Sequence, residues 1–182
     1  MTDEFPKRDL NTPILLTDLK EGELEAILAK YSKNLRPCGD CTLCCKVMAV
    51  PEIAKPWDKW CQHCDPKKGC NIYPTRPLEC KSFYCMWALG IIPESLKPNK
   101  VHVVMSTTLE GKHLVVHHDP DYPEAHNVPR MREFYRSAIK QGFKVICRKG
   151  TDYYEFDHVK DLWYQLIQKE EEHGFIKVFK RM

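Results

Sequence analysis

Long apolar runs are missing from this 182-residue chain. A membrane-spanning helix needs about 18 or more consecutive apolar residues, and no window of the sequence approaches that length. The N-terminus also lacks an apolar run of signal-peptide length and carries acidic residues from the start. We therefore expect a cytoplasmic protein with no membrane partner.

A large excess of charge of one sign is missing as well. The formal net charge is +3, from 28 lysines and arginines against 25 aspartates and glutamates. Domains that bind nucleic acid through many phosphates need a basic stripe with a larger surplus. A nucleic-acid partner is therefore not expected, and we expect a protein partner whose identity the sequence does not reveal.

Cysteine, by contrast, is abundant: nine of the ten cysteines fall within the 48 residues from Cys38 to Cys85. In an exported chain they would suggest disulfides, but a reducing cytosol favours metal ligation or redox catalysis. The nine candidate metal ligands are Cys38, Cys41, Cys44, Cys45, Cys61, Cys64, Cys70, Cys80 and Cys85.

The spacing of these cysteines fits two kinds of metal site. Cys38, Cys41 and Cys44 form the C-x-x-C-x-x-C run with which bacterial ferredoxins hold an iron-sulfur cluster. Cys61 and Cys64 form a further C-x-x-C pair of the type found in zinc knuckles. The cofactor is thus zinc or an iron-sulfur cluster, and the pattern leaves the two about equally open.

Two pairs of cysteines argue against a single simple site. The side chains of the adjacent Cys44 and Cys45 diverge, so both rarely ligate one tetrahedral ion. Cys80 and Cys85, if both lie on one helix, are about 140° apart around its axis. We therefore expect two centres or one polynuclear cluster.

Other residues near this pattern have simpler interpretations. Cys147 stands alone in an expected strand, and we expect it to be a core residue. His63 is expected to point out of the knuckle, and His117 and His118 are expected to be exposed to solvent. Four cations could offset the thiolate charge: Lys46, Lys55, Arg76 and Lys81.

Apolar periodicity and turn residues predict an α+β fold. Its parts are an N-terminal arm and helix over 1–36, an irregular cysteine-rich metal-cluster module with short helices over 37–92, and a small antiparallel sheet with two helices over 93–182, packed on the module. The expected helices cover 18–34, 77–89, 129–141 and 158–172. The expected strands cover 46–50, 101–105, 114–117, 143–147, 153–156 and 175–179.

The cysteine pattern resembles the YkgJ-type family of bacterial cysteine-cluster proteins. The shared features are C-x-x-C-x-x-C-C from Cys38 to Cys45 and C-x-I-Y-x-x-R-P-x-x-C from Cys70 to Cys80. The resemblance covers roughly residues 38 to 90 and implies a zinc- or iron-chelating domain. Flagellin lysine methylases look similar in this region. This chain is short for such an enzyme and has no glycine-rich cofactor loop, so we do not expect it to be a methylase.

Three functions follow from these patterns. The favoured one is a metal-binding protein that acts as an accessory, assembly or interaction module without catalysis of its own. The first alternative is an iron-sulfur oxidoreductase or transferase component, in which the cluster moves electrons or binds substrate. The second alternative is a zinc-knuckle nucleic-acid binder, which the small net charge disfavours.

Overall fold

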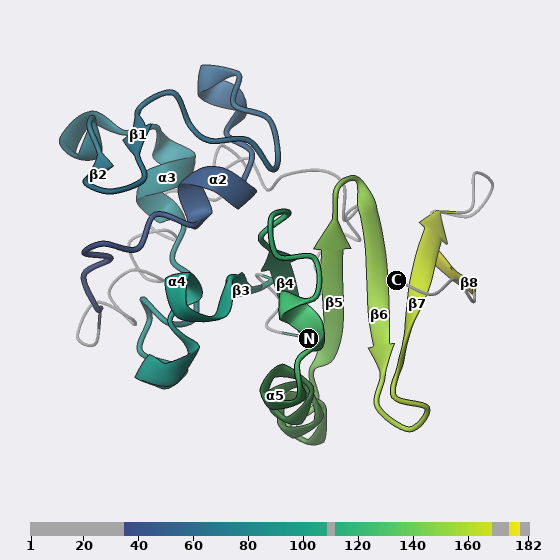
Figure 1. The fold of residues 1–182 in the computed structure, drawn as a ribbon. Helices are drawn as coiled ribbons and strands as arrows, with labels where there is room; N and C mark the ends of the chain where they lie inside the picture. Colours follow the sequence, from purple (N-terminus) through teal and green to yellow (C-terminus); the bar gives the residue numbers. More distant parts are fainter. Residues whose placement is uncertain (1–34, 109–111, 169–174, 179–182) are drawn as a thin grey trace, which may run out of the picture.

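The computed structural model describes residues 35–108, 112–168 and 175–178, so the expected helix over 18–34 lies outside the described residues. The described part has an α+β fold (Figure 1). Its helices are α2 (Cys44–Val47), α3 (Leu78–Ser82), α4 (Pro98–Val101) and α5 (Pro129–Lys140), with 3-10 turns η2 (Pro51–Ile53), η3 (Tyr73–Thr75), η4 (Glu94–Leu96) and η5 (Ala125–Asn127). Its strands are β1 (Cys64–Asp65), β2 (Gly69–Cys70), β3 (Val103–Thr107), β4 (His113–His118), β5 (Lys144–Lys149), β6 (Asp152–Asp157), β7 (Leu162–Gln168) and β8 (Phe175–Val178). None of the helices in these ranges is long and apolar enough to cross a membrane.

Strands β3 to β8 form one six-stranded sheet in which sequence neighbours are also spatial neighbours. The expected pairing of β3 with β4 and of β5 with β6 is confirmed, and β8 extends the sheet as expected. The sheet is mixed rather than antiparallel, because β4 and β5 run parallel. A parallel pair cannot be joined by a tight turn, and α5 provides the crossover between them.

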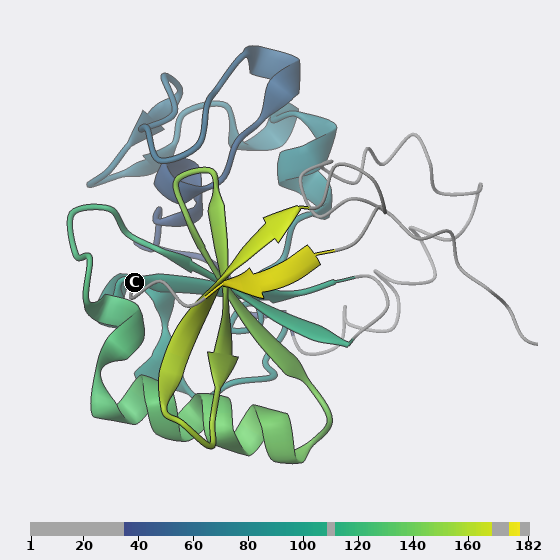
Figure 2. The same cartoon turned by 90° about the vertical axis from the view of Figure 1, so that its right-hand side faces the viewer.

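Helix α5 confirms the expected helix over 129–141 and supplies much of the core. Pro129 occupies its first turn, where the missing backbone N–H costs nothing. Met131, Tyr135 and Ala138 are buried along one stripe. The Tyr135 ring meets Phe156 of β6 edge-to-face at 5.8 Å between centroids. In Figures 1 and 2 this helix lies below the strands, whereas the cysteine-rich segment lies above them.

The expected helix over 158–172 is wrong within the described residues, which form a turn and strand β7. Apolar residues there recur at helical spacing, but Trp163 pairs with Phe156 across the sheet instead. The Asp157 carboxylate accepts hydrogen bonds from the N–H groups of Val159 and Lys160 at 2.9 and 3.0 Å. This aspartate turn starts a hairpin, and packing on the sheet overrides the local helical periodicity.

Two expected elements in the cysteine-rich segment are also corrected. The expected strand over 46–50 is wrong, because its first two residues belong to helix α2, whose last turn is closed by the Met48 N–H donating to the Cys44 carbonyl. Of the rest, Val50 forms only an isolated bridge with Lys55. The expected helix over 77–89 ends at Ser82, because the chain becomes extended at Phe83. Further on, the Met86 N–H donates to the Met105 carbonyl of β3 at 2.8 Å. Bonding to the sheet thus takes the place of further helical turns.

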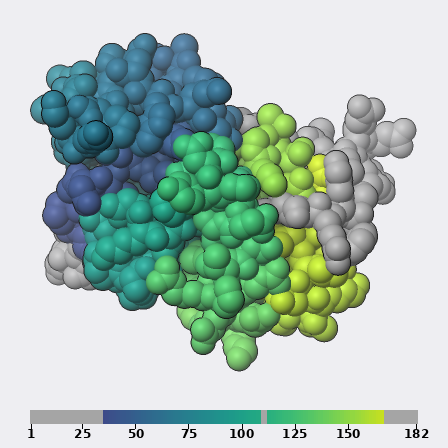
Figure 3. Space-filling model, viewed as in Figure 1, coloured from purple at the N-terminus to yellow at the C-terminus, as the bar shows by residue number. Residues whose placement is uncertain are grey.

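A buried arginine joins the cysteine-rich segment to the sheet. Arg148 of β5 is fully buried and makes two hydrogen bonds to the Asp58 carboxylate, at 2.8 and 3.1 Å. It also donates to the Val47 carbonyl of α2 at 3.0 Å, and its guanidinium lies 4.1 Å from the Trp57 ring centroid. The two halves consequently meet directly, as the blue and green surfaces in Figure 3 show.

A second ion pair reinforces this junction. The Lys46 ammonium group, buried on α2, lies 2.5 Å from carboxylate oxygens of both Asp119 and Asp121 in the loop after β4. Burial opposes the charged form, but the hydrogen bonds to both carboxylates raise the net pKa of Lys46. Helix α2 is therefore held at two successive residues. The Lys46 side chain binds the two carboxylates, and the Val47 carbonyl accepts a hydrogen bond from Arg148.

Replacement of Asp58 by asparagine tests this junction. Asp58 has a φ of 58°, a left-handed conformation that asparagine also tolerates, so Asp58→Asn removes charge with little backbone strain. The buried Arg148 then loses its counter-ion, and we expect the free energy of unfolding to fall by about 3 kcal/mol in urea titrations. Lys68→Ala, which removes an exposed ion pair with Asp65, is the control and should cost at most about 1 kcal/mol. Equal effects of the two substitutions would contradict the assigned role of Asp58.

Candidate metal centre

Four cysteines gather where α2 approaches the sheet. The Cys41 N–H donates to the Cys38 carbonyl at 2.9 Å, in a turn where Gly39 adopts the left-handed φ of 57° that favours glycine. Cys41 is buried beside Val104 of β3, and two further cysteines pack against the same apolar cluster. We call these four the sheet-side group: Cys38, Cys41, Cys44 and Cys85.

Cys85 joins this group although it lies 41 residues beyond Cys44 in the sequence. The Ala88 N–H donates to its sulfur at 3.4 Å. Burial raises the pKa of Cys85 to about 11, against the lowering effect of the Ala88 N–H. The nearby charges of Cys38 and Cys41 raise this pKa further. Cys85 therefore packs against the same apolar cluster as Cys41.

Five other cysteines gather around the small hairpin of β1 and β2. The Cys61 N–H donates to the Cys45 carbonyl at 2.9 Å, and the Cys64 N–H donates to the Cys61 carbonyl at 3.0 Å. Cys64 and Cys70 face each other across the two strands. Burial raises the pKa of Cys80 to about 11, and the neighbouring charges of Cys45, Cys61 and Cys70 add to that effect. We call these five the hairpin-side group: Cys45, Cys61, Cys64, Cys70 and Cys80.

The adjacent Cys44 and Cys45 lie at the boundary between the two groups. Their side chains share a hydrogen bond that raises the pKa of Cys44 and lowers that of Cys45 to about 6. Cys45 also shares a side-chain hydrogen bond with Cys64. A thiolate is the form that ligates metal, and this arrangement favours one at Cys45 near neutral pH.

Three cations contribute to the electrostatics of the two groups. Arg76 lowers the pKa of Cys38, Cys45 and Cys80, although burial dominates at Cys38 and Cys80. Lys55, whose ammonium donates to backbone carbonyls of α2 and its surroundings, acts in the same direction on Cys45. Lys97 does so on Cys38 and Cys41. Arg76 and Lys55 were expected, whereas Lys97 was missed because it lies beyond the cysteine-rich segment and no motif marks it.

The remaining candidates are placed differently. Cys147 is fully buried in β5, and burial raises its pKa to about 12, which supports its role as a core residue. The expected exposure of His117 and His118 is wrong, because both are buried beside Arg148. His63 is half-buried and contacts Gln62 in the hairpin region. Lys46 binds Asp119 and Asp121, and its charge is therefore used at the junction with the sheet.

The donor chemistry fits a thiolate-bound metal, although the sulfur atoms of the described cysteines do not converge on one position. All ten cysteines lie in the described ranges, and none forms a disulfide. Within those ranges, no three His, Cys, Asp or Glu side chains already meet in metal-binding geometry. Thiolates select zinc, copper(I) or iron-sulfur clusters. The two groups would hold such a metal, and the N–H donors to Cys41 and Cys85 match the hydrogen bonds that tune metal-bound sulfur.

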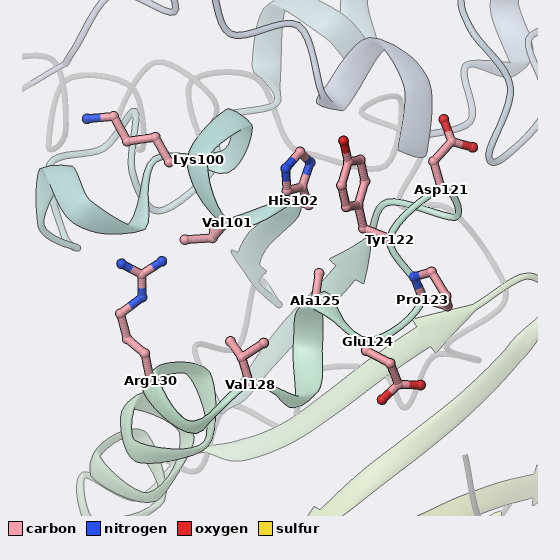
Figure 4. A pocket seen from close by; sticks show the side chains of 10 residues that line it. All are labelled: Lys100, Val101, His102, Asp121, Tyr122, Pro123, Glu124, Ala125, Val128 and Arg130. Atoms are coloured by element: carbon pink, nitrogen blue, oxygen red, sulfur yellow. The ribbon is translucent and has the colours of Figure 1, made fainter.

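A shallow pocket of about 450 Å³ lies apart from the cysteines, between α4 and the start of α5 (Figure 4). His102 and Tyr122 stack at its edge with ring centroids 3.5 Å apart. The side chains of Lys100 and Arg130 lie on one side of it. No cysteine lines the pocket, so it belongs to neither cysteine group.

Comparison with known proteins finds no matching family model, no matching curated protein and no matching solved structure.

The buried His117 gives a prediction for acid stability. Its Nδ1 accepts a hydrogen bond from Arg148 Nε at 3.2 Å, so the ring must be neutral, and burial lowers its pKa to about 3. The unfolded chain takes up this proton near pH 6.5. The free energy of unfolding should therefore fall by about 1.4 kcal/mol per pH unit for this residue as the pH drops from 6.5 towards 3.

His117→Asn retains an acceptor for Arg148 but cannot titrate. We expect urea midpoints between pH 7 and pH 4 to depend less on pH in this variant than in the wild type. His158→Asn, at an exposed position, should leave the wild-type dependence in place. Identical pH profiles for His117→Asn and the wild type would show that His117 does not carry the effect.

Proposed function

We propose that this chain is a metal-binding cysteine-cluster protein whose thiols hold zinc or an iron-sulfur cluster. The single observation that carries the proposal is the gathering of nine cysteines, from Cys38 to Cys85, into two neighbouring groups. Four separate stretches of chain supply them, so the gathering does not follow from local spacing alone. The resemblance of these cysteines to the YkgJ-type pattern also supports the proposal.

The alternative that these are ordinary core cysteines fits the contacts less well. Cysteines of an apolar core act as small hydrophobes, as Cys147 does. In the two groups, by contrast, thiols hydrogen-bond to one another and accept backbone N–H groups, and Arg76, Lys55 and Lys97 lie close enough to favour thiolates. Such surroundings favour a thiolate at Cys45. At other members of the two groups burial outweighs the cations and raises the pKa, so that a bound metal would be what holds them as thiolates: Cys38, Cys41, Cys80 and Cys85.

We propose an accessory, assembly or interaction role in the reducing cytoplasm, with a protein as partner. The cysteine-rich segment exposes large apolar side chains, with Trp60, Tyr73 and Leu78 at 42%, 52% and 45% of full exposure. Exposed aromatic residues of this kind are enriched at protein interfaces. The pocket beside His102 contributes no thiol to the cysteine groups.

A bound metal would stabilise the fold of the cysteine-rich segment. When bound, the metal would supply cross-links between segments that otherwise share few apolar contacts. For structural zinc, such binding contributes about 10 to 16 kcal/mol in small peptides and acts as folding free energy. The Arg148 and Lys46 junction would hold the loaded segment against the sheet.

Metal analysis of protein purified without oxygen tests the proposal. We expect stoichiometric zinc in a colourless protein, or iron with sulfide in a brown one. Cys41→Ser should lose metal and unfold more readily, because Cys41 is buried within the sheet-side group. Cys147→Ala is the matched control, a buried cysteine outside both groups, and should retain the wild-type metal content. Metal-free wild-type protein, or equal metal content in the two variants, would overturn the proposal.

A further inference from the structure

We propose that the nine cysteines form two separate metal centres, divided between Cys44 and Cys45. The sheet-side group holds one centre and the hairpin-side group holds the other. This inference rests on the proposed metal-binding function and goes beyond it, because it assigns each cysteine to a centre. It also selects between the two centres and the single polynuclear cluster that the sequence leaves open.

The division follows first from helix α2, which carries both cysteines. Consecutive residues of an α-helix are about 100° apart around its axis, so the two sulfurs leave the helix in different directions. Cys44 packs with Cys41 and Cys85 against the apolar cluster that contains Val104 of the sheet. Its sulfur is thereby placed on the side of α2 that faces the sheet.

Cys45 is joined to the hairpin, while its thiol meets that of Cys44 where the two groups adjoin. Its carbonyl accepts the Cys61 N–H, and its side chain shares a hydrogen bond with Cys64. Cys64 in turn pairs with Cys70 across the two-stranded hairpin. These contacts join Cys45 to the hairpin rather than to the cluster that contains Cys41.

Cys80 and Cys85 divide in the same way. Helix α3 carries Cys80 and ends at Ser82, and the extended backbone at Phe83 then redirects the chain. The Met86 N–H bonds to β3, which leaves Cys85 against the sheet-side cluster. Cys80 lies on α3 and does not belong to that cluster.

The number of thiols in each group is sufficient for a centre. The sheet-side group offers four sulfurs, the complement of a tetrahedral zinc ion or of an iron-sulfur cluster. The hairpin-side group offers five, one more than a single tetrahedral ion uses. Neither group therefore needs a ligand from the other.

Thiol protection in variants tests this division. Wild-type protein, Cys85→Ala and the double variant Cys61→Ala/Cys64→Ala are purified without oxygen, analysed for metal and treated in the folded state with N-ethylmaleimide, and the labelled cysteines are identified by tandem mass spectrometry. In Cys85→Ala we expect loss of about half the metal and labelling of Cys38, Cys41 and Cys44, with Cys45 still protected. The hairpin-side group has one thiol to spare, so two must be removed to leave fewer than four; in the double variant we expect the reverse, with labelling of Cys45, Cys70 and Cys80 and with Cys44 still protected.

Cys147 serves as an internal control, because it becomes reactive only if the sheet core opens. Should a variant label there as well, the same question is put to the wild type by graded treatment with a chelator. Thiols should then be released as sets, with Cys44 and Cys45 labelled on different molecules at partial metal loss. Release of all nine thiols together, or labelling that mixes the two sets, would overturn the division while leaving metal binding intact. Wild-type protein that carries no metal would instead overturn the proposed function itself.

Discussion

The buried pair of Arg148 and Asp58 is the interaction on which the arrangement of this molecule depends. It places a charge from the middle of the sheet against the loop and helix that carry the cysteines. Desolvation of both partners is costly, and a buried ion pair is often no more stabilising than apolar residues would be. What the pair contributes is position: the guanidinium also binds the Val47 carbonyl, stacks on Trp57 and requires a neutral His117.

The position of α2 in turn decides where the cysteine sulfurs lie. Lys46 binds Asp119 and Asp121 and the Val47 carbonyl binds Arg148, so the residues directly after Cys44 and Cys45 are fixed to the sheet. The described segment between α2 and α3 contains only short elements, and the buried apolar cluster beside it is small. A small core leaves stability to be supplied by other means, and metal ligation is a common one. The sheet and the loop after β4 therefore hold α2, and with it Cys44 and Cys45, in place.

Elements whose local pattern agrees with their packing were predicted correctly. The stripe of Met131, Tyr135 and Ala138 gave helix α5, and the apolar runs around Val104 and Val116 gave a hairpin. Errors arose where tertiary contacts override the pattern. Trp163 recurs at helical spacing but is used in β7, and the residues after Ser82 leave the helix to bond with β3. The parallel step at β4 and β5 was also missed, because an intervening helix does not by itself reveal strand direction.

By itself, the sequence determined which donor atoms this protein offers. The density and spacing of thiols between Cys38 and Cys85 are properties of the chain whatever fold surrounds them, and the proposal of metal binding rests on them. Only the tertiary structure decided the grouping. The direction of each sulfur is set by helix rotation at Cys44 and Cys45, by the break in the chain after Ser82, and by contacts with a sheet formed from later residues. The burial of His117, the role of Lys97 and the junction at Arg148 likewise depend on contacts between segments far apart in the sequence, which local patterns do not encode.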